Sequence, residues 1–135
     1  MRTFRYYYHG PVAKWIRRLV IEFANWFKQA YGVNHQITIR VYANGYLDTG
    51  NGLAYGCFAR RWGKPCIWLA TWWYFWRDDG VVKNRDEARE EILDCLVHEF
   101  AEYDKWRRGV PNNHRGIQRR VDFITRQFSH ERRLS

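Results

Sequence analysis

A histidine and two glutamates lie within five consecutive residues of the chain, as His98, Glu99 and Glu102. The surrounding pattern predicts a helix, and helical residues four apart stand on one face, a single turn from each other. His98 and Glu102 can therefore reach one metal ion, since zinc accepts imidazole nitrogen and carboxylate oxygen at about 2.0–2.2 Å. Glu99 would then stand beside the ion as the catalytic general base, taking a proton from metal-bound water.

A catalytic zinc site needs a third protein ligand and an open position for water. His114 is the first candidate, because residues 109–113 predict a turn that folds the next helix back and brings its first turn towards His98. Asp122, two turns further along, is the alternative. The sequence leaves this choice open.

The first half of the chain predicts one helix followed by a small sheet. Apolar residues recur at three- and four-residue spacing from residue 11 to about 31, which is typical of an amphipathic helix. Pro11 fits its first turn, and Gly32 fits the position just past its end. Alternating or short apolar runs then predict strands, which together indicate three to four strands in a largely antiparallel or mixed sheet. The predicted strands cover residues 36–43, 46–49, 53–60 and 64–71.

Two more helices are predicted in the last third of the chain. The first begins at residue 84 or 86, ends before Gly109 and contains His98. Acidic residues near its start and basic residues near its end complement the helix dipole. The second runs from about 113 to 132, with Asn113 as a good cap. Its predicted inward face consists of Ile117, Val121, Ile124 and Phe128.

This order of elements, together with the histidine–glutamate motif, resembles the minimal zincin metalloprotease core of SprT-like and related small zinc peptidases. The segments that show the resemblance are 96–103, Trp106 and 113–116. The resemblance implies one zincin-like α+β domain over residues 1–135, with His98 as first ligand, Glu99 as base and Glu102 in the place of the second ligand. It also implies Zn²⁺ as cofactor and a peptide or protein as substrate.

The chain departs from the family pattern at Glu102, where zincins have a second histidine, so that the motif is HExxE in place of HExxH. A carboxylate ligand lowers the Lewis acidity that makes bound water a nucleophile, and it favours harder ions such as Mn²⁺ or Fe²⁺. Three interpretations follow: a metal-dependent peptidase with altered ligands, a metal held only for structure, and a zincin-like fold with another use.

The charge balance indicates a second class of function. The chain has 23 Lys and Arg against 14 Asp and Glu, a formal net charge of +9. Such an excess favours nucleic acid or another polyanion as partner, although a basic helix face can also serve only solubility. The alternative hypothesis is an inactive zincin-fold protein that binds nucleic acid or a protein partner. Several arginines gather in the predicted last helix, namely Arg115, Arg119, Arg120, Arg126, Arg132 and Arg133.

Other classes are disfavoured by composition. A length of 135 residues suits one domain. No run approaches the roughly 20 apolar residues of a membrane span, and the first eight residues lack a secretory signal, so we expect a cytoplasmic protein without a membrane partner. Cys57, Cys66 and Cys95 form no CxxC pair and are expected to be buried free thiols. The aromatic run 68–76 is expected to pack mainly as core, with part of it free to line a cleft or contact a partner.

Overall fold

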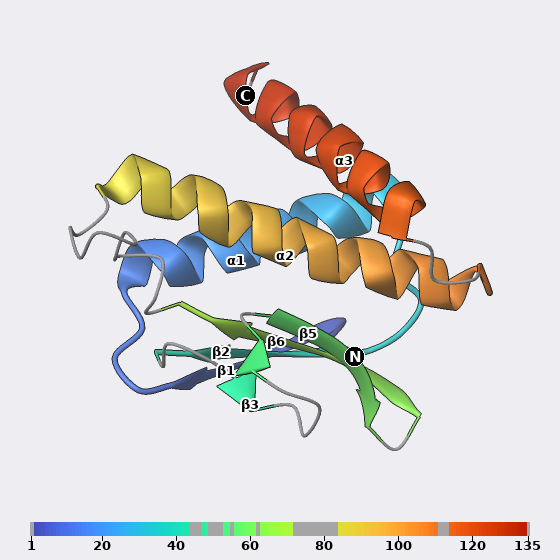
Figure 1. Cartoon of the computed structure of the whole chain (residues 1–135), viewed down its shortest axis with the longest axis horizontal. Coiled ribbons are helices and arrows are strands. Elements are labelled where there is room, and N and C mark those ends of the chain that lie inside the picture. The colour runs from blue at the N-terminus through green and yellow to red at the C-terminus, as the bar shows by residue number, and fades with distance from the viewer. Residues whose placement is uncertain are drawn as a thin grey trace.

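The computed structural model describes residues 2–43, 47–48, 53–54, 56–61, 63–71, 84–110 and 114–134. They form an α+β arrangement of a four-stranded mixed sheet, a short two-stranded sheet and three helices (Figure 1). The predicted α+β class is therefore confirmed. In chain order the elements are β1 (Phe4–His9), α1 (Lys14–Tyr31), β2 (Ile37–Tyr42), β3 (Leu47–Asp48), β4 (Leu53–Ala54), β5 (Gly56–Arg61), β6 (Lys64–Ala70), α2 (Arg85–Arg107) and α3 (His114–Leu134).

Helix α1 follows the predicted apolar spacing. Its buried stripe packs towards the sheet, and Gly32 ends the helix with φ 75°, a conformation that favours glycine. The start differs from the prediction, because Ala13 is the extended N-cap residue and Pro11 lies outside the helix. The buried residues are Ile16, Leu19, Val20, Phe23, Ala24 and Phe27.

The main sheet has the strand order β1-β2-β6-β5. Strand β2 is parallel to both of its neighbours, β1 and β6, whereas β5 is antiparallel to β6. A mixed sheet was one of the two predicted forms and is confirmed, whereas a largely antiparallel sheet is wrong. Parallel pairing requires a long crossover between strands, and α1 provides it between β1 and β2.

Strand β1 was not predicted. Phe4 is buried and Tyr6 and Tyr8 are half-buried on the side of the helices, while Arg5 and Tyr7 are exposed. Tyrosines on both faces hide the alternation that identifies a half-buried strand. The predicted strand 53–60 is also divided, since β4 pairs with β3 and β5 pairs with β6.

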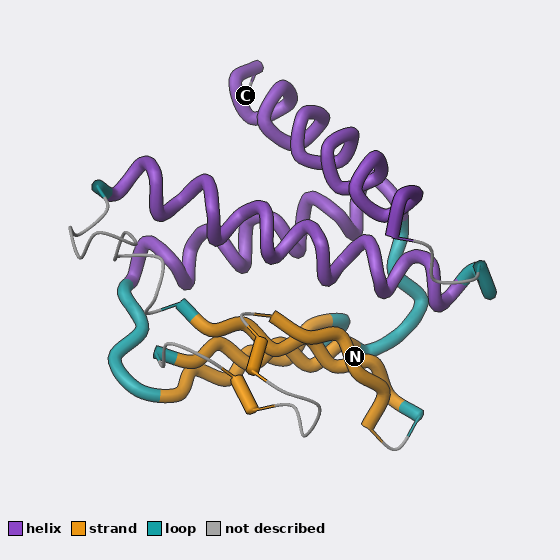
Figure 2. Tube along the Cα trace, in the orientation of Figure 1, coloured by secondary structure: helices purple, strands orange, loops and turns teal. Residues whose placement is uncertain are grey.

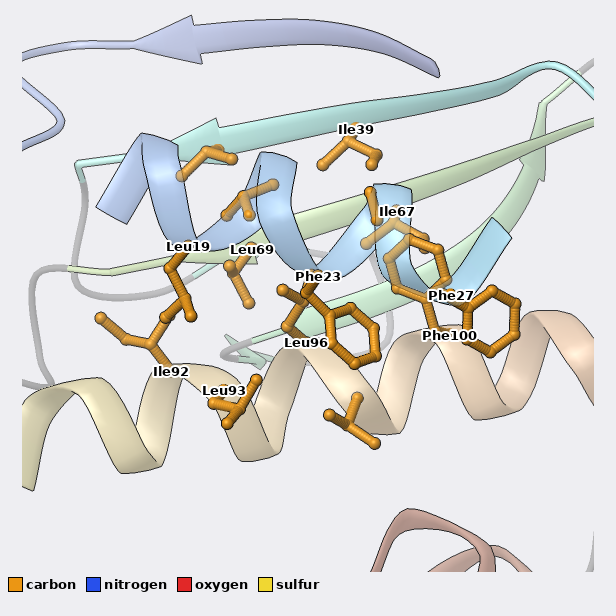
Figure 3. Packing of buried hydrophobic residues seen from close by; sticks show 14 of the residues in the cluster. Leu19, Phe23, Phe27, Ile39, Ile67, Leu69, Ile92, Leu93, Leu96 and Phe100 are labelled. Atoms are coloured by element: carbon orange, nitrogen blue, oxygen red, sulfur yellow. The ribbon is translucent and has the colours of Figure 1, made fainter. Parts of the chain in front are cut away.

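The elements form layers (Figures 1 and 2). Helices α1 and α2 cover one face of the sheet, and α3 packs against them from the side away from the sheet. The core lies between the helices and the sheet, where Phe23, Phe27 and Phe100 meet Ile39 and Ile67 (Figure 3). None of the described helices combines the length and apolar character needed to cross a membrane.

The cysteines form no disulfide, so the prediction of free thiols is confirmed. Cys66 is buried, whereas Cys57 and Cys95 are only partly buried. In the aromatic run, Trp68 lies in β6 and is partly buried. Residues 72–76 lie outside the described part of the chain, and the prediction for them stays a prediction.

Candidate functional site

The HExxE motif lies in the middle of α2, which is packed on several sides. The Asn84 side chain caps the helix by accepting a 2.8 Å hydrogen bond from the Glu87 N–H, and Gly109 follows its end with φ 67°. Between these ends, α2 packs against α1, the sheet and α3. The motif therefore stands on a rigid element. The buried residues that surround it are Leu96, Val97, Phe100, Ala101 and Tyr103.

His98 and Glu102 lie side by side on a half-exposed face of α2. His98 Nε2 and Glu102 Oε1 are 3.7 Å apart, and the side chains are 39% and 18% exposed. Two bonds of about 2.1 Å meeting at a tetrahedral angle would hold their donor atoms about 3.4 Å apart. The pair thus fits two adjacent ligand positions around one ion after a small side-chain movement.

Glu99 lies in a different environment, only 5% exposed. Burial raises its pKa to about 8, and the nearby charge of Glu102 adds to the shift. Its carboxylate meets the start of β5, because a Cβ placed on Gly56 would lie 3.2 Å from Glu99 Oε2 and 2.7 Å from Cys95 Sγ. Strand β5 approaches α2 this closely only because residue 56 has no side chain.

The thiol of Cys57 belongs to the same region. Burial raises its pKa, and the Glu99 charge adds to this effect. The sequence pattern placed Cys95 one turn before His98, as a core thiol or a residue surrounding the site, but gave no role to Gly56. A glycine inside a strand pattern is a signal of close backbone approach, so Gly56 could have marked the strand that covers Glu99.

Strand β5 is an edge strand of the main sheet, and its first residue lies beside the motif helix α2. Among the described residues, no strand pairs with its outer edge. An extended peptide can add to such an edge through main-chain hydrogen bonds. Within the described part of the chain, the outer edge of β5 is therefore unpaired and begins beside the buried carboxylate of Glu99.

Helix α3 returns along α2, and this direction bears on the third ligand (Figure 1). A Cβ on Gly116 would lie 3.8 Å from Lys105 Nζ, so the start of α3 lies beside the last turns of α2. Lys105 is two turns, about 10 Å, beyond His98. The side chain of His114, two residues before Gly116, lies outside the described residues, and its role as a ligand stays a prediction.

Asp122, the alternative third ligand, lies further along α3 and affects a carboxyl of α2. Burial raises the pKa of Asp94, while the charge of His98 lowers it and that of Asp122 raises it. Asp94 thus has both His98 and Asp122 within electrostatic range. Asp122 stays the alternative third ligand, and the choice between it and His114 stays open.

The complete predicted ligand set is not assembled in the described part of the chain. No three His, Cys, Asp or Glu side chains there are grouped so that they could hold a metal ion. The structure brings together His98 and Glu102 as two donors, with Glu99 buried beside them. The ion itself, Zn²⁺ or a harder ion, stays a prediction.

The arginines of α3 have two different environments. Two of them form ion pairs with other helices. Arg120 lies 3.6 Å from Asp104 of α2, and Arg132 lies 2.5 Å from Glu22 of α1. Arg119 and Arg126 are exposed on α3, and Phe123 between them is 52% exposed. Spacings of four and three residues place these three on one helix face. The side chains of Arg115 and Arg133 lie outside the described residues.

Comparisons with protein-family models, with curated proteins and with solved structures find no match for this chain. The resemblance to zincins therefore rests on the motif and the order of elements. Function has to be argued from the geometry of α2, β5 and α3.

Proposed function

We propose that this chain is a metal-dependent peptidase, or a peptidase-like protein, of the zincin type. His98 and Glu102 hold the ion, a side chain of α3 completes the ligand set, and Glu99 is the general base. When bound, the metal polarises a water molecule and a substrate carbonyl for amide hydrolysis. The alternative ions Mn²⁺ and Fe²⁺ belong to the proposal because Glu102 supplies a carboxylate oxygen.

The main support is the position of Glu99 between two features. On one side, Glu102 is close enough to affect its pKa and stands 3.7 Å from His98. On the other side, Glu99 Oε2 packs against the backbone of β5 at Gly56. A general base needs such a position, within reach of the activated water molecule and of the peptide bond that this water attacks.

The arrangement of β5 supports a peptide as substrate. A peptide paired with its outer edge would run beside α2, which holds its scissile carbonyl close to the HExxE face. The succession of α1, the sheet, the motif helix α2 and α3 also supports the proposal, because the zincin resemblance implies this succession; β1 before α1 is an additional strand.

Metal content tests the ligand assignment first. Untagged wild-type protein should contain about one metal ion per chain by elemental analysis after purification or after incubation with Zn²⁺ or Mn²⁺. His98→Ala and Glu102→Ala should both lose it. His114→Ala and Asp122→Asn then identify the third ligand, because only one of these two should release the ion. Folded wild-type protein that binds neither metal would refute the proposal.

Peptide cleavage tests the role of Glu99. With a mixture of unstructured peptides, the metal-loaded wild type should cleave and Glu99→Gln should lose at least about a hundredfold in rate, within the range for general acid–base catalysis. Glu99→Gln must keep its metal, since the amide removes the base and not a ligand. Equal cleavage by both proteins would exclude Glu99 as the base.

A second candidate function, binding of nucleic acid, is favoured by the exposed face of α3. Arg119, Phe123 and Arg126 combine two cations with an aromatic ring, a combination that suits phosphates and stacked bases. An oligonucleotide should bind with strongly salt-dependent affinity. Arg119→Gln with Arg126→Gln should weaken binding by about tenfold or more, whereas Arg5→Gln with Lys64→Gln should not. Equal weakening would indicate a diffuse charge effect and exclude a site on α3.

A further inference from the structure

A second site lies at the other end of α2, where α1, α2 and α3 meet. A cavity of about 170 Å³ is lined by Arg18 of α1, Arg85 and Arg89 of α2, and Arg132 of α3. Four arginines from three helices thus converge on one small space. In Figure 1 the beginnings of α1 and α2 lie at the same side of the molecule, and α3 runs from the other side back in that direction.

The charge of this cavity is unbalanced. Among the described lining residues, Glu22 supplies the one carboxylate against four guanidinium groups, which leaves three positive charges in excess. Like charges held in a partly enclosed space repel each other, because the surrounding protein screens them less than water does. An anion with several charges would neutralise this excess.

The lining side chains are partly positioned without any ligand. Arg132 Nε is 2.5 Å from Glu22 Oε1, which ties α3 to α1. The Arg85 guanidinium stands over the Trp15 ring, 5.4 Å from its centroid, so its orientation is restrained by a cation–π contact. Preorganised guanidinium groups lose less entropy when they bind an anion, and their planar fork matches two oxygens of a phosphate.

We propose that this cavity binds a ligand bearing two or more linked phosphate groups. Its volume is below the range of about 300–1,000 Å³ that accommodates drug-sized ligands, so it suits an oligophosphate moiety and not a whole nucleoside. An adjoining cavity of about 290 Å³ shares Arg89 and Arg132 and adds Ser129 and Glu90. The remainder of a larger phosphorylated molecule would lie there. This site uses no residue of the HExxE motif and does not depend on the peptidase proposal.

Calorimetric titration with inorganic tripolyphosphate tests the proposal directly. We expect saturable binding of one tripolyphosphate per chain, weaker binding of orthophosphate, and at least a tenfold loss of affinity in Arg89→Gln. Arg18→Gln, at an exposed position, should show a similar loss and is the variant least able to affect folding. Circular dichroism should show both variants folded.

Arg5→Gln is the matched control, because it removes the same charge from the exposed side of β1, on the sheet face away from the helices. It should change the affinity less than twofold. A single-stranded oligonucleotide forms the second arm of the experiment and identifies the source of the phosphates. Oligonucleotide binding lost in Arg89→Gln and Arg18→Gln, without tripolyphosphate binding, would assign the cavity to a nucleic-acid backbone. If neither probe binds, or if all three variants weaken binding equally, the proposed site is refuted.

Discussion

Burial of Glu99 makes the free energy of unfolding depend on pH. Its pKa rises from 4.5 to about 8 on folding, so between these values the folded state holds a proton that the unfolded state releases. Stability contributed by this group is complete below pH 4.5 and is lost as the pH rises towards 8. The whole shift corresponds to at most about 5 kcal/mol at roughly 1.4 kcal/mol per pH unit.

We therefore expect metal-free wild-type protein to lose stability between pH 5 and pH 8. In Glu99→Gln the side chain cannot ionise, so its free energy of unfolding should decrease less steeply with pH. The variant should therefore become more stable relative to wild type as the pH rises. Urea denaturation at several pH values in the presence of a chelator measures both slopes. Parallel curves for the two proteins would show that Glu99 is not buried as a neutral acid.

Gly56 should tolerate no side chain, since a Cβ would lie 2.7 Å from Cys95 Sγ. Gly56→Ala is expected to cost about 1–3 kcal/mol, the usual range for overpacking. Cys95→Ala removes the sulfur, and the double variant should recover about 1 kcal/mol or more of that cost. Denaturant unfolding of the wild type, both single variants and the double variant gives the coupling free energy between positions 56 and 95. A coupling near zero would mean that β5 lies further from α2 at this point.

At the scale of elements, Asp104 connects the helices. Its nearly buried carboxylate accepts a 2.9 Å hydrogen bond from Arg107 Nε. It also forms ion pairs with Arg107 at 2.7 Å, with Arg108 just after α2 at 3.0 Å, and with Arg120 of α3 at 3.6 Å. Arg107 also donates to the carbonyl of Tyr31 at the end of α1. One carboxylate thus organises the junction of the three helices.

Asp104→Ala is expected to destabilise the protein by about 2–3 kcal/mol, because it leaves charged partners without their anion in a partly desolvated place. Asp86→Ala, at an exposed acid in the first turn of α2, is the control and should cost less than about 1 kcal/mol. Chemical denaturation measures both. Similar costs for the two would mean that the Asp104 junction contributes nothing specific.

At the scale of the whole molecule, metal binding should be linked to global stability. Helix α2 packs against every layer, so an ion held by His98 and Glu102 binds only the folded state. Zn²⁺ or Mn²⁺ at a hundred times its dissociation constant should add about 2.7 kcal/mol. Thermal unfolding should show this gain in wild type and none in His98→Ala; an equal gain in both would locate the ion elsewhere.

The sequence by itself determined the elements whose patterns are long and local. The apolar spacing of α1, α2 and α3, the start of α2 near residue 84 and the glycines that follow α1 and α2 depend on contacts within a few residues, and all are found in the structure. The predicted cap Asn113 lies outside the described residues. The proximity of His98 and Glu102 also follows from helix geometry alone. These predictions needed no knowledge of the partner elements.

Only the tertiary structure decided the pairing of strands and the surroundings of each charged group. The parallel strand pairs, the edge position of β5 and the close approach of Gly56 to Glu99 depend on residues about 28 to 43 positions apart, and no local pattern specifies them. The choice of third ligand between His114 and Asp122 likewise depends on how α3 packs on α2, and the turn prediction alone does not settle it. The physical reason is that burial and electrostatics depend on what packs against a face, while sequence periodicity reveals only which face is apolar.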